Sequence, residues 1–132
     1  MEKLAAKTRD IKFFSKKNGA MITVHSIWAK KYTEMLEEDS SIKLYRTNIA
    51  LENWGDKIST IGLRTSYLQT GWSSDFMLVM QDGSVAIREL MTADDLKKKA
   101  EMEKLEISRR YWKVAHVNDW GVGMVTKEGA AW

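Results

Sequence analysis

The sequence contains no cysteine and no proline, and its only two histidines, His25 and His116, lie far apart in the chain. The lack of cysteine excludes a disulfide framework and any thiolate metal site. It also fits the reducing cytosol, so we expect a cytoplasmic protein. Two distant histidines argue against a zinc site. We draw no function from the absence of proline.

Long apolar runs are also missing. No apolar stretch approaches the roughly 18 residues of a membrane span, and the first 17 residues are too charged for a signal peptide. At 132 residues with 44% hydrophobic content, the chain can bury a real core but is too short for two domains. We therefore expect no membrane association and a single α/β domain over residues 21–132, preceded by a basic arm, residues 1–20.

Charge is unevenly distributed along the chain, although the net charge is only +3. Residues 1–31 hold eight basic and two acidic residues, residues 32–95 hold five and eleven, and residues 96–132 hold eight and five. Basic ends suit a polyanion such as DNA, because Lys and Arg bind phosphates. A solvated surface of mixed charge explains the same pattern. The candidate DNA-binding residues are Lys16, Lys17, Lys97, Lys98, Lys99, Arg109 and Arg110.

The spacing of apolar residues predicts the secondary structure. Ser26 is the expected N-cap of a helix that ends near residue 39. A stripe containing Ala100, Ile107, Tyr111 and Val114 predicts a long helix over residues 96–114. The other expected elements are a short apolar run at 21–24, strands at 42–51, 61–68 and 116–125, and a loop at 52–59.

A β-hairpin is predicted at residues 72–90, because Asp82-Gly83 between two apolar runs tolerates the positive φ of a tight turn. Asp75 opens its first strand. Side chains alternate along a strand, so Arg88 and Leu90 share one face of the second strand and Glu89 has the other. In nucleases with the pattern acid, then acid-x-Lys, the two carboxylates hold Mg²⁺ and the lysine orients the attacking water.

The last third of the chain resembles a known family. Residues 103–112, EKLEISRRYW, and residues 119–128, DWGVGMVTKE, are similar to the end of the nuclease domain of TnsA, the end-cleaving subunit of heteromeric transposases. The Ser26 helix and Asp75-Phe76 extend the resemblance to about residues 21–128. It implies a PD-(D/E)xK, restriction-endonuclease-like fold with a mixed central sheet of about four to five strands flanked by helices. The second, helical domain of TnsA lies outside the resemblance.

The resemblance also implies a degenerate active site. Asp75 matches the central metal-binding acid, whereas Ala29 replaces the helix acid, Arg88 the second-strand acid and Leu90 the lysine. We therefore expect no bound metal or other cofactor, with Asp75 a relic that pairs with Arg88 across the hairpin. Metal binding by Asp75 is the alternative.

Relocated catalysis is less favoured by the sequence. Glu89 is expected on the strand face away from Arg88 and Leu90. Glu37 and Glu38 lie about 12 Å further along their helix than Ala29, at 1.5 Å per residue.

The aromatic residues have two interpretations. Trp28, Tyr111 and Trp112 occupy helical stripes and are expected in the core. Trp54 and Trp72 lie near turns, where partial burial is expected and a stacking or interface role is the alternative.

Three functions follow. The first is a catalytically inactive TnsA-like protein that binds DNA, a protein partner such as a transposase subunit, or both. The second is an active Mg²⁺-dependent DNA endonuclease with a relocated site. The third is a structural or interaction protein, by analogy with TnsA-like head-completion proteins of tailed phages. The sequence does not indicate an oligomeric state.

Overall fold

The computed structural model describes residues 8–59, 72–126 and 129–131. Its main sheet has the strand order β3-β4-β5-β6-β7 within these residues. All neighbouring strands are antiparallel except β5 and β6, which are parallel. The strands are β3 (Ile42–Ala50), β4 (Ser73–Met80), β5 (Val85–Met91), β6 (Asp119–Thr126) and β7 (Gly129–Ala131). The α/β class and the mixed sheet predicted from the sequence are confirmed.

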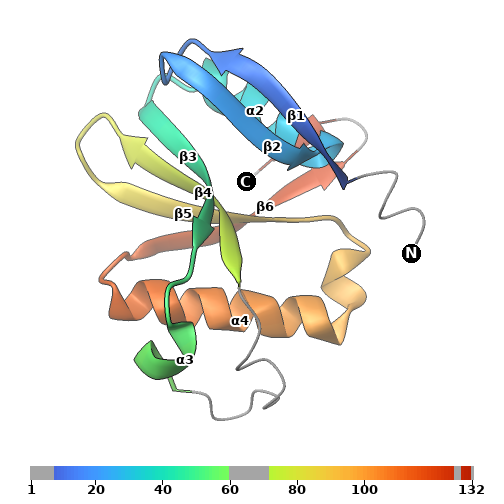
Figure 1. Cartoon of the computed structure of the whole chain (residues 1–132), viewed down its shortest axis with the longest axis vertical. Coiled ribbons are helices and arrows are strands. Elements are labelled where there is room, and N and C mark those ends of the chain that lie inside the picture. Colours follow the sequence, from blue (N-terminus) through green and yellow to red (C-terminus); the bar gives the residue numbers. More distant parts are fainter. Residues whose placement is uncertain (1–7, 60–71, 127–128, 132) are drawn as a thin grey trace.

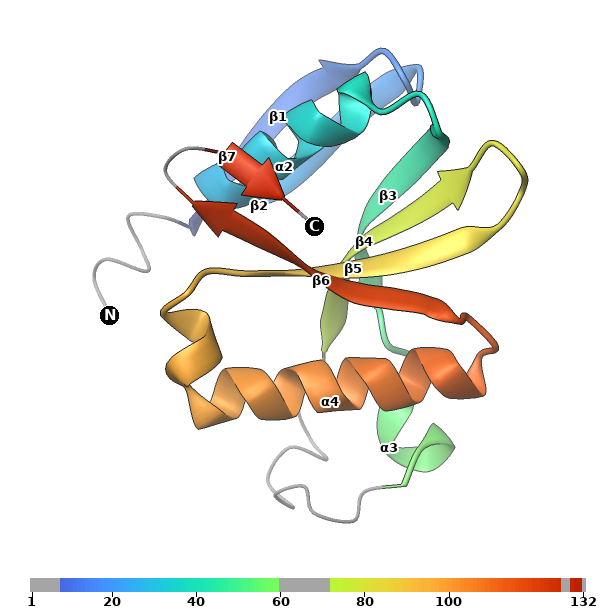
Figure 2. The ribbon, with the colours of Figure 1, turned by 180° about the vertical axis from the view of Figure 1, so that it is seen from behind.

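A helical crossover makes the parallel pair possible, since parallel neighbours need a long connection. It consists of the 3₁₀ helix η2 (Asp95–Lys97) and α4 (Lys99–Val114). Helix α4 lies along one side of the sheet, and α2 (Ile27–Glu38) lies on the other side (Figures 1 and 2). No helix among the described residues is long and apolar enough to span a membrane.

A second, two-stranded sheet covers α2. Strands β1 (Thr8–Ser15) and β2 (Ala20–Ser26) form an antiparallel hairpin. The predicted basic arm is therefore wrong for residues 8–20. Ile11 and Phe13 alternate with exposed Lys12 and Phe14 and pack against the core, so this basic segment is also a half-buried strand. Residues 1–7 lie outside the described part.

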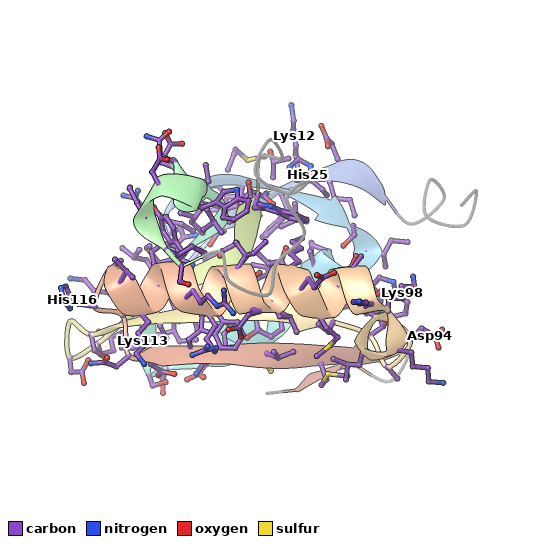
Figure 3. All side chains as sticks on the ribbon, turned by 90° about the horizontal axis from the view of Figure 1, so that it is seen from below. Lys12, His25, Asp94, Lys98, Lys113 and His116 are labelled. Carbon is purple, nitrogen blue, oxygen red and sulfur yellow. The ribbon has the colours of Figure 1, made fainter. Side chains whose placement is uncertain are left out.

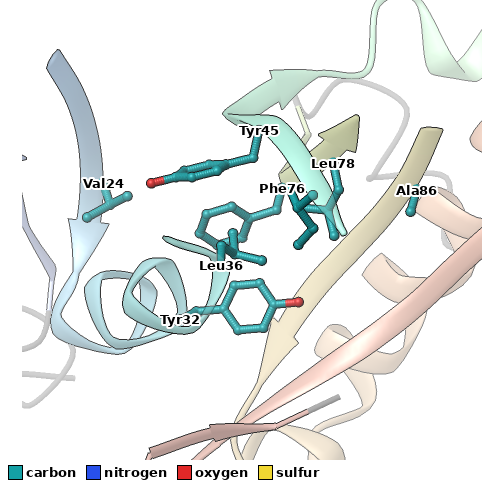
Figure 4. Close-up of a cluster of buried hydrophobic side chains, with 8 residues drawn as sticks. Val24, Tyr32, Leu36, Tyr45, Phe76, Leu78 and Ala86 are labelled. Carbon is teal, nitrogen blue, oxygen red and sulfur yellow. The ribbon is translucent and has the colours of Figure 1, made fainter. Parts of the chain in front are cut away.

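Two cores lie on opposite sides of the sheet. The first joins β2 and α2 to the sheet and contains Tyr32, Tyr45 and Phe76, whose rings pack together (Figure 4). The second joins the sheet to α4 and to α3 (Trp54–Lys57), with Trp54, Ile87, Ile107 and Trp112 buried in it.

Several predicted elements are confirmed with adjusted bounds. The Ser26 hydroxyl caps α2 by accepting a hydrogen bond from the Ala29 amide, and the Asp82-Gly83 turn joins β4 to β5 with Gly83 at a φ of +89°. The loop expected at 52–59 contains the single turn α3. The strand expected at 116–125 is β6, which begins at Asp119, and the short strand β7 that follows it was not predicted. The strand expected at 61–68 lies outside the described residues.

The buried face of α4 differs from the predicted stripe. Val114 is 53% exposed and Ala100 is exposed as well, whereas Leu105, Ser108 and Trp112 are buried. The stripe therefore locates only the middle of the helix correctly.

Strand β3 exchanges its two faces at Asn48, which adopts a φ of +55°. Tyr45 packs in the first core, yet Ile49, four residues later, packs against the second. Strict alternation would keep these two side chains on one face. The neighbouring strand β4 makes the same exchange at Asp75, because Phe76 packs in the first core while Ser74 bonds to α4. Asp75 therefore lies where the sheet changes faces.

Candidate functional site

Asp75 and Glu89 lie side by side on neighbouring strands and are called the acid pair below. The Asp75 amide donates a hydrogen bond to Glu89 Oε1 at 3.0 Å, and the Leu90 amide donates to Asp75 Oδ2 at 2.8 Å. The hairpin register brings them together, because Phe76 pairs with Arg88 and the next residues outward are Asp75 and Glu89. The two carboxylates thus share one end of the hairpin.

Glu89 is anchored from the opposite side by α4. Its carboxylate accepts a hydrogen bond from the Ser108 hydroxyl and is only 2% exposed. The Ser108 oxygen in turn accepts a hydrogen bond from Trp120 Nε1 at 2.9 Å and lies 3.2 Å from the Ser74 hydroxyl. This network holds Glu89 in one orientation.

Burial, and after it the neighbouring charge of Glu89, together raise the pKa of Asp75 to about 7. The ammonium group of Lys104 opposes this by favouring the ionised form. Two like charges this close are unfavourable in a low-dielectric site. The acid pair therefore retains a proton under conditions where an exposed Asp has lost its own, unless a cation replaces that proton.

The acid pair adjoins a cavity of about 300 Å³, called the first cavity. It lies between the beginnings of α2 and α4 and the end of β5. Ala29, Asp75 and Lys104 all line it. Its other lining residues are Ser26, Trp28, Leu90, Met91, Thr92, Asp95 and Glu101.

Among the described residues that line this cavity, Lys104 is the one lysine. Its Nζ lies 5.9 Å from the centroid of the Trp72 ring, a cation–π contact. It forms no ion pair with any residue that the structure describes. The ammonium group is therefore available to a ligand in the cavity, and Trp72 is a half-buried neighbour of the site.

The predicted pairing of Asp75 with Arg88 is wrong. The Arg88 guanidinium bonds to Asp119 at 2.8 Å and to the Ile87 carbonyl at 2.9 Å. Phe76, opposite Arg88, belongs to the first core, so Arg88 leaves the strand on the α2 side. As expected from alternation, Glu89 and Arg88 lie on opposite faces of β5. The face that Glu89 occupies brings its carboxylate next to Asp75, which the sequence did not predict.

The assignment of site positions along β5 therefore shifts by one residue. Glu89 and Met91 share the α4 side of the strand, so an acid-x-Lys pattern fits Glu89-Leu90-Met91 with Met91 in the lysine position. Met91 is 3% exposed. Ala29 lines the first cavity, where an acid on α2 would reach. The charged residue that sequence reasoning missed is Lys104, because its contact with the hairpin is not local.

The two acids of α2 considered for a relocated site, Glu37 and Glu38, do not line the first cavity. Glu37 accepts hydrogen bonds from the hydroxyls of Ser15 and Tyr45 and from the Lys17 amide, which hold its pKa below the usual range despite partial burial. Glu38 is exposed. Within the described residues, no cluster of three or more His, Cys, Asp or Glu side chains is arranged to hold a metal ion.

The candidate DNA-binding residues do not form one surface. Lys17 Nζ donates to the carbonyls of Asp39 and Ile42, so it closes the end of α2 instead of facing solvent. Lys16 is exposed on the β1–β2 turn. Arg109 and Arg110 both bind the Glu106 carboxylate, at distances down to 2.7 Å. Lys97, Lys98 and Lys99 are exposed at the beginning of α4, where Figure 3 labels Lys98.

Comparison with models of known protein families gives no match for this chain, and comparison with curated proteins gives no significant match.

Proposed function

We propose that this protein is a Mg²⁺-dependent nuclease whose site is the acid pair together with Lys104. The observation that carries the proposal is a pair of adjacent carboxylates, with Glu89 buried and Asp75 half-buried, beside a cavity that a lysine from another element also lines. Buried like charges are unfavourable and perturbed carboxylates cluster at functional sites. The geometry therefore favours the relocated-site alternative over an inactive protein.

The acid pair suits a hard divalent cation. Mg²⁺ binds through one or two carboxylates and keeps several of its waters, so Asp75, which lines the cavity, and Glu89 directly behind it are a sufficient protein donor set. When bound, the ion would polarise a phosphodiester and lower the pKa of a coordinated water. Asp75 and Glu89 would hold it in place of the shared proton. Metal affinity should therefore rise with pH up to about 7, where the pKa of Asp75 lies.

Lys104 would supply the charge that the strand position lacks. Its ammonium group lies close enough to Asp75 to lower the pKa of that carboxyl, and it has no ion-pair partner among the described residues. In this position it would bind a phosphate oxygen or orient the attacking water, which are the roles of the lysine in acid-x-Lys sites. Met91 cannot do either.

The proposed substrate is DNA, and the proposed fold is restriction-endonuclease-like. The TnsA resemblance and the α/β sheet with a helix on each side support this. A role in cutting or processing DNA with a transposase or phage assembly subunit, in the cytoplasm, follows from the same resemblance. Fold alone does not establish activity, so the argument depends on the site.

Plasmid cleavage tests the proposal. Supercoiled plasmid incubated with the protein and Mg²⁺ or Mn²⁺ should be nicked or linearised, and Asp75→Asn and Glu89→Gln should abolish cleavage. Lys104→Gln should slow it by about 100-fold, the typical loss of one charge-stabilising group. Asp94→Asn and Lys43→Gln are matched controls, because both side chains are exposed and form no ion pair within the described residues (Asp94 is labelled in Figure 3).

Metal binding can be measured separately, because a ligand that binds only the native state raises the Tm. Millimolar Mg²⁺ or Mn²⁺ should raise the Tm of the wild-type protein but not of Asp75→Asn. Cleavage that survives in Asp75→Asn, or a Tm that is insensitive to both ions, would contradict the proposal.

A catalytically inactive DNA-binding protein is the second candidate. Two observations favour it: Ala29 places no acid in the cavity and Met91 occupies the lysine position. It predicts salt-dependent binding of duplex DNA without metal-dependent cutting. Failure to bind DNA at any salt concentration would leave the protein-partner role.

A further inference from the structure

A second cavity of about 300 Å³ lies on the other flank of α4, between its C-terminal half and the beginning of β6. It shares no lining residue with the first cavity. Lys104 and Lys113 are nine residues apart, which separates them by about 14 Å along the helix and about half a turn around it. Figure 3 labels Lys113 near the C-terminal end of α4. The lining residues are Arg109, Lys113, Val117, Asn118 and Trp120.

Part of this cavity is fixed by contacts beneath it. Trp120 Nε1 donates to the Ser108 oxygen at 2.9 Å, which sets the orientation of the indole ring. Arg109 donates through Nε and one terminal nitrogen to Glu106, at 2.9 and 2.7 Å. A site whose groups are already oriented loses little conformational entropy when it binds.

The other polar groups are available. The side chains of Lys113 and Asn118 are exposed and form no hydrogen bond or ion pair with any residue that the structure describes. The described residues that line the cavity include no carboxylate, and Glu106 hydrogen-bonds only to the Arg109 side chain among them. Two cationic side chains and an amide would bind a phosphate, whose oxygens accept charge-assisted hydrogen bonds.

The indole of Trp120 adds a flat apolar wall beside these cations. An aromatic side chain next to Arg and Lys is the usual arrangement for stacking a nucleobase while its phosphate is held. A base inside a duplex has both faces covered by its neighbours, so only an unpaired base can stack on the ring. The volume is at the lower end of the range for ligand pockets, which suits one nucleotide.

We propose that the second cavity binds one unpaired nucleotide of single-stranded DNA, with the base on Trp120 and the phosphate between Arg109 and Lys113. This inference goes beyond the metal site, since it needs neither Asp75 nor a metal ion. A DNA strand bound on this flank of α4, opposite the first cavity, would pass around the helix instead of lying across one flat surface.

Fluorescence anisotropy of a labelled 12-nucleotide dT strand, measured in EDTA, tests the inference. EDTA removes any contribution from the proposed metal site, so the two proposals can fail independently. Lys113→Gln should weaken binding about threefold to tenfold at low salt and reduce the slope of log K against log salt by about 0.7, the value for one phosphate contact on a single strand.

Two further variants address the stacking and the amide. Trp120→Phe should keep most of the affinity and Trp120→Leu should lose about tenfold, in line with one stacked base. Because Trp120 also packs against the second core, circular dichroism must show that both variants fold. Asn118→Ala, on an exposed side chain, gives a smaller loss without that complication.

Lys43→Gln is the matched control, since Lys43 is exposed on β3 and lines neither cavity. Equal losses for Lys43→Gln and Lys113→Gln would overturn the inference, because general electrostatics would then explain the binding. Duplex DNA bound as tightly as the single strand would also overturn it. If dTMP displaces the labelled strand when both are present at the same concentration of nucleotides, the cavity binds free nucleotides and the inference is overturned.

Discussion

Replacing Asp75 with Asn should make the protein more stable at neutral pH. Asn has the same shape and keeps an oxygen for the hydrogen bond from the Leu90 amide, which is 2.8 Å long in the native protein. Its NH₂ group can also donate to the neighbouring Glu89 carboxylate. The substitution removes one of two adjacent like charges without leaving an unsatisfied group, so stability should rise.

The magnitude follows from the pKa of Asp75, which is raised from 3.8 to about 7. A carboxyl with a raised pKa in the folded state binds more protons when folded than when unfolded, so it destabilises the fold progressively as pH rises from about 4 to about 7. At 1.36 kcal/mol per pKa unit, the full penalty is on the order of 4 kcal/mol, an upper estimate for a coupled pair. Asp75→Asn should therefore match the wild type near pH 4 and exceed it by on the order of 2–4 kcal/mol at pH 8.

Urea unfolding followed by tryptophan fluorescence at pH 4.5, 6 and 8 measures this difference. Asp94→Asn is the control, because its exposed side chain should give the same stability as the wild type at each pH. A wild-type protein that is more stable than Asp75→Asn at pH 8 without metal would refute the interpretation of the acid pair. Adding Mg²⁺ at pH 8 should narrow the gap, because only the wild type would gain from it.

Three other substitutions, one of them with a matched control, test separate parts of the structure. Glu106→Gln should destabilise the protein at neutral pH, because the Arg side chains bound to Glu106 lower the pKa of that carboxyl to about 2. The loss of stability should vanish as pH falls from about 4.5 toward 2, and urea unfolding at several pH values measures it. Gly123→Ala should destabilise the protein by about 1–3 kcal/mol, because the added Cβ would lie 2.8 Å from a ring carbon of Tyr32. Gly121→Ala is its control and should leave the Tm unchanged, because the Cβ added there would lie 3.7 Å from its nearest atom. Ser108→Ala should lower stability by about 1–3 kcal/mol by leaving buried polar groups without their partner, and an unchanged urea midpoint would argue against the network.

Local sequence signals predicted the elements that local chemistry determines. Ser26 before an apolar stripe located α2 and its cap, and Asp82-Gly83 located the β4–β5 turn. Strand β1 was missed because its lysines suggested a solvated arm, although Ile11 and Phe13 carry the alternation of a half-buried strand. Charge and burial occur together on a two-faced strand, and composition alone does not separate them.

The site was harder to predict because it depends on two non-local features. Alternation placed Glu89 opposite Arg88 correctly, but only the exchange of faces at Asn48 and Asp75 shows where Asp75 itself lies. Nothing in the hairpin sequence indicates this exchange, and the one local signal for it is Asn48 on the neighbouring strand β3, since Asn tolerates positive φ. Lys104 reaches the hairpin from a helix that packs against it, and sequence spacing does not encode that contact.

The parallel pairing of β5 with β6 has a consequence for the order in which the chain folds. The acid pair is 14 residues apart and closes with the β4–β5 hairpin, whereas β6 pairs with β5 only after the whole α4 crossover is in place. Loop closure favours the shorter loop, so we expect the two carboxylates to meet before Lys104 and Ser108 arrive. Repulsion within the pair would then slow the closing of the hairpin more than it speeds unfolding. Stopped-flow refolding of Asp75→Asn that is no faster than wild type at pH 8 would rule this order out.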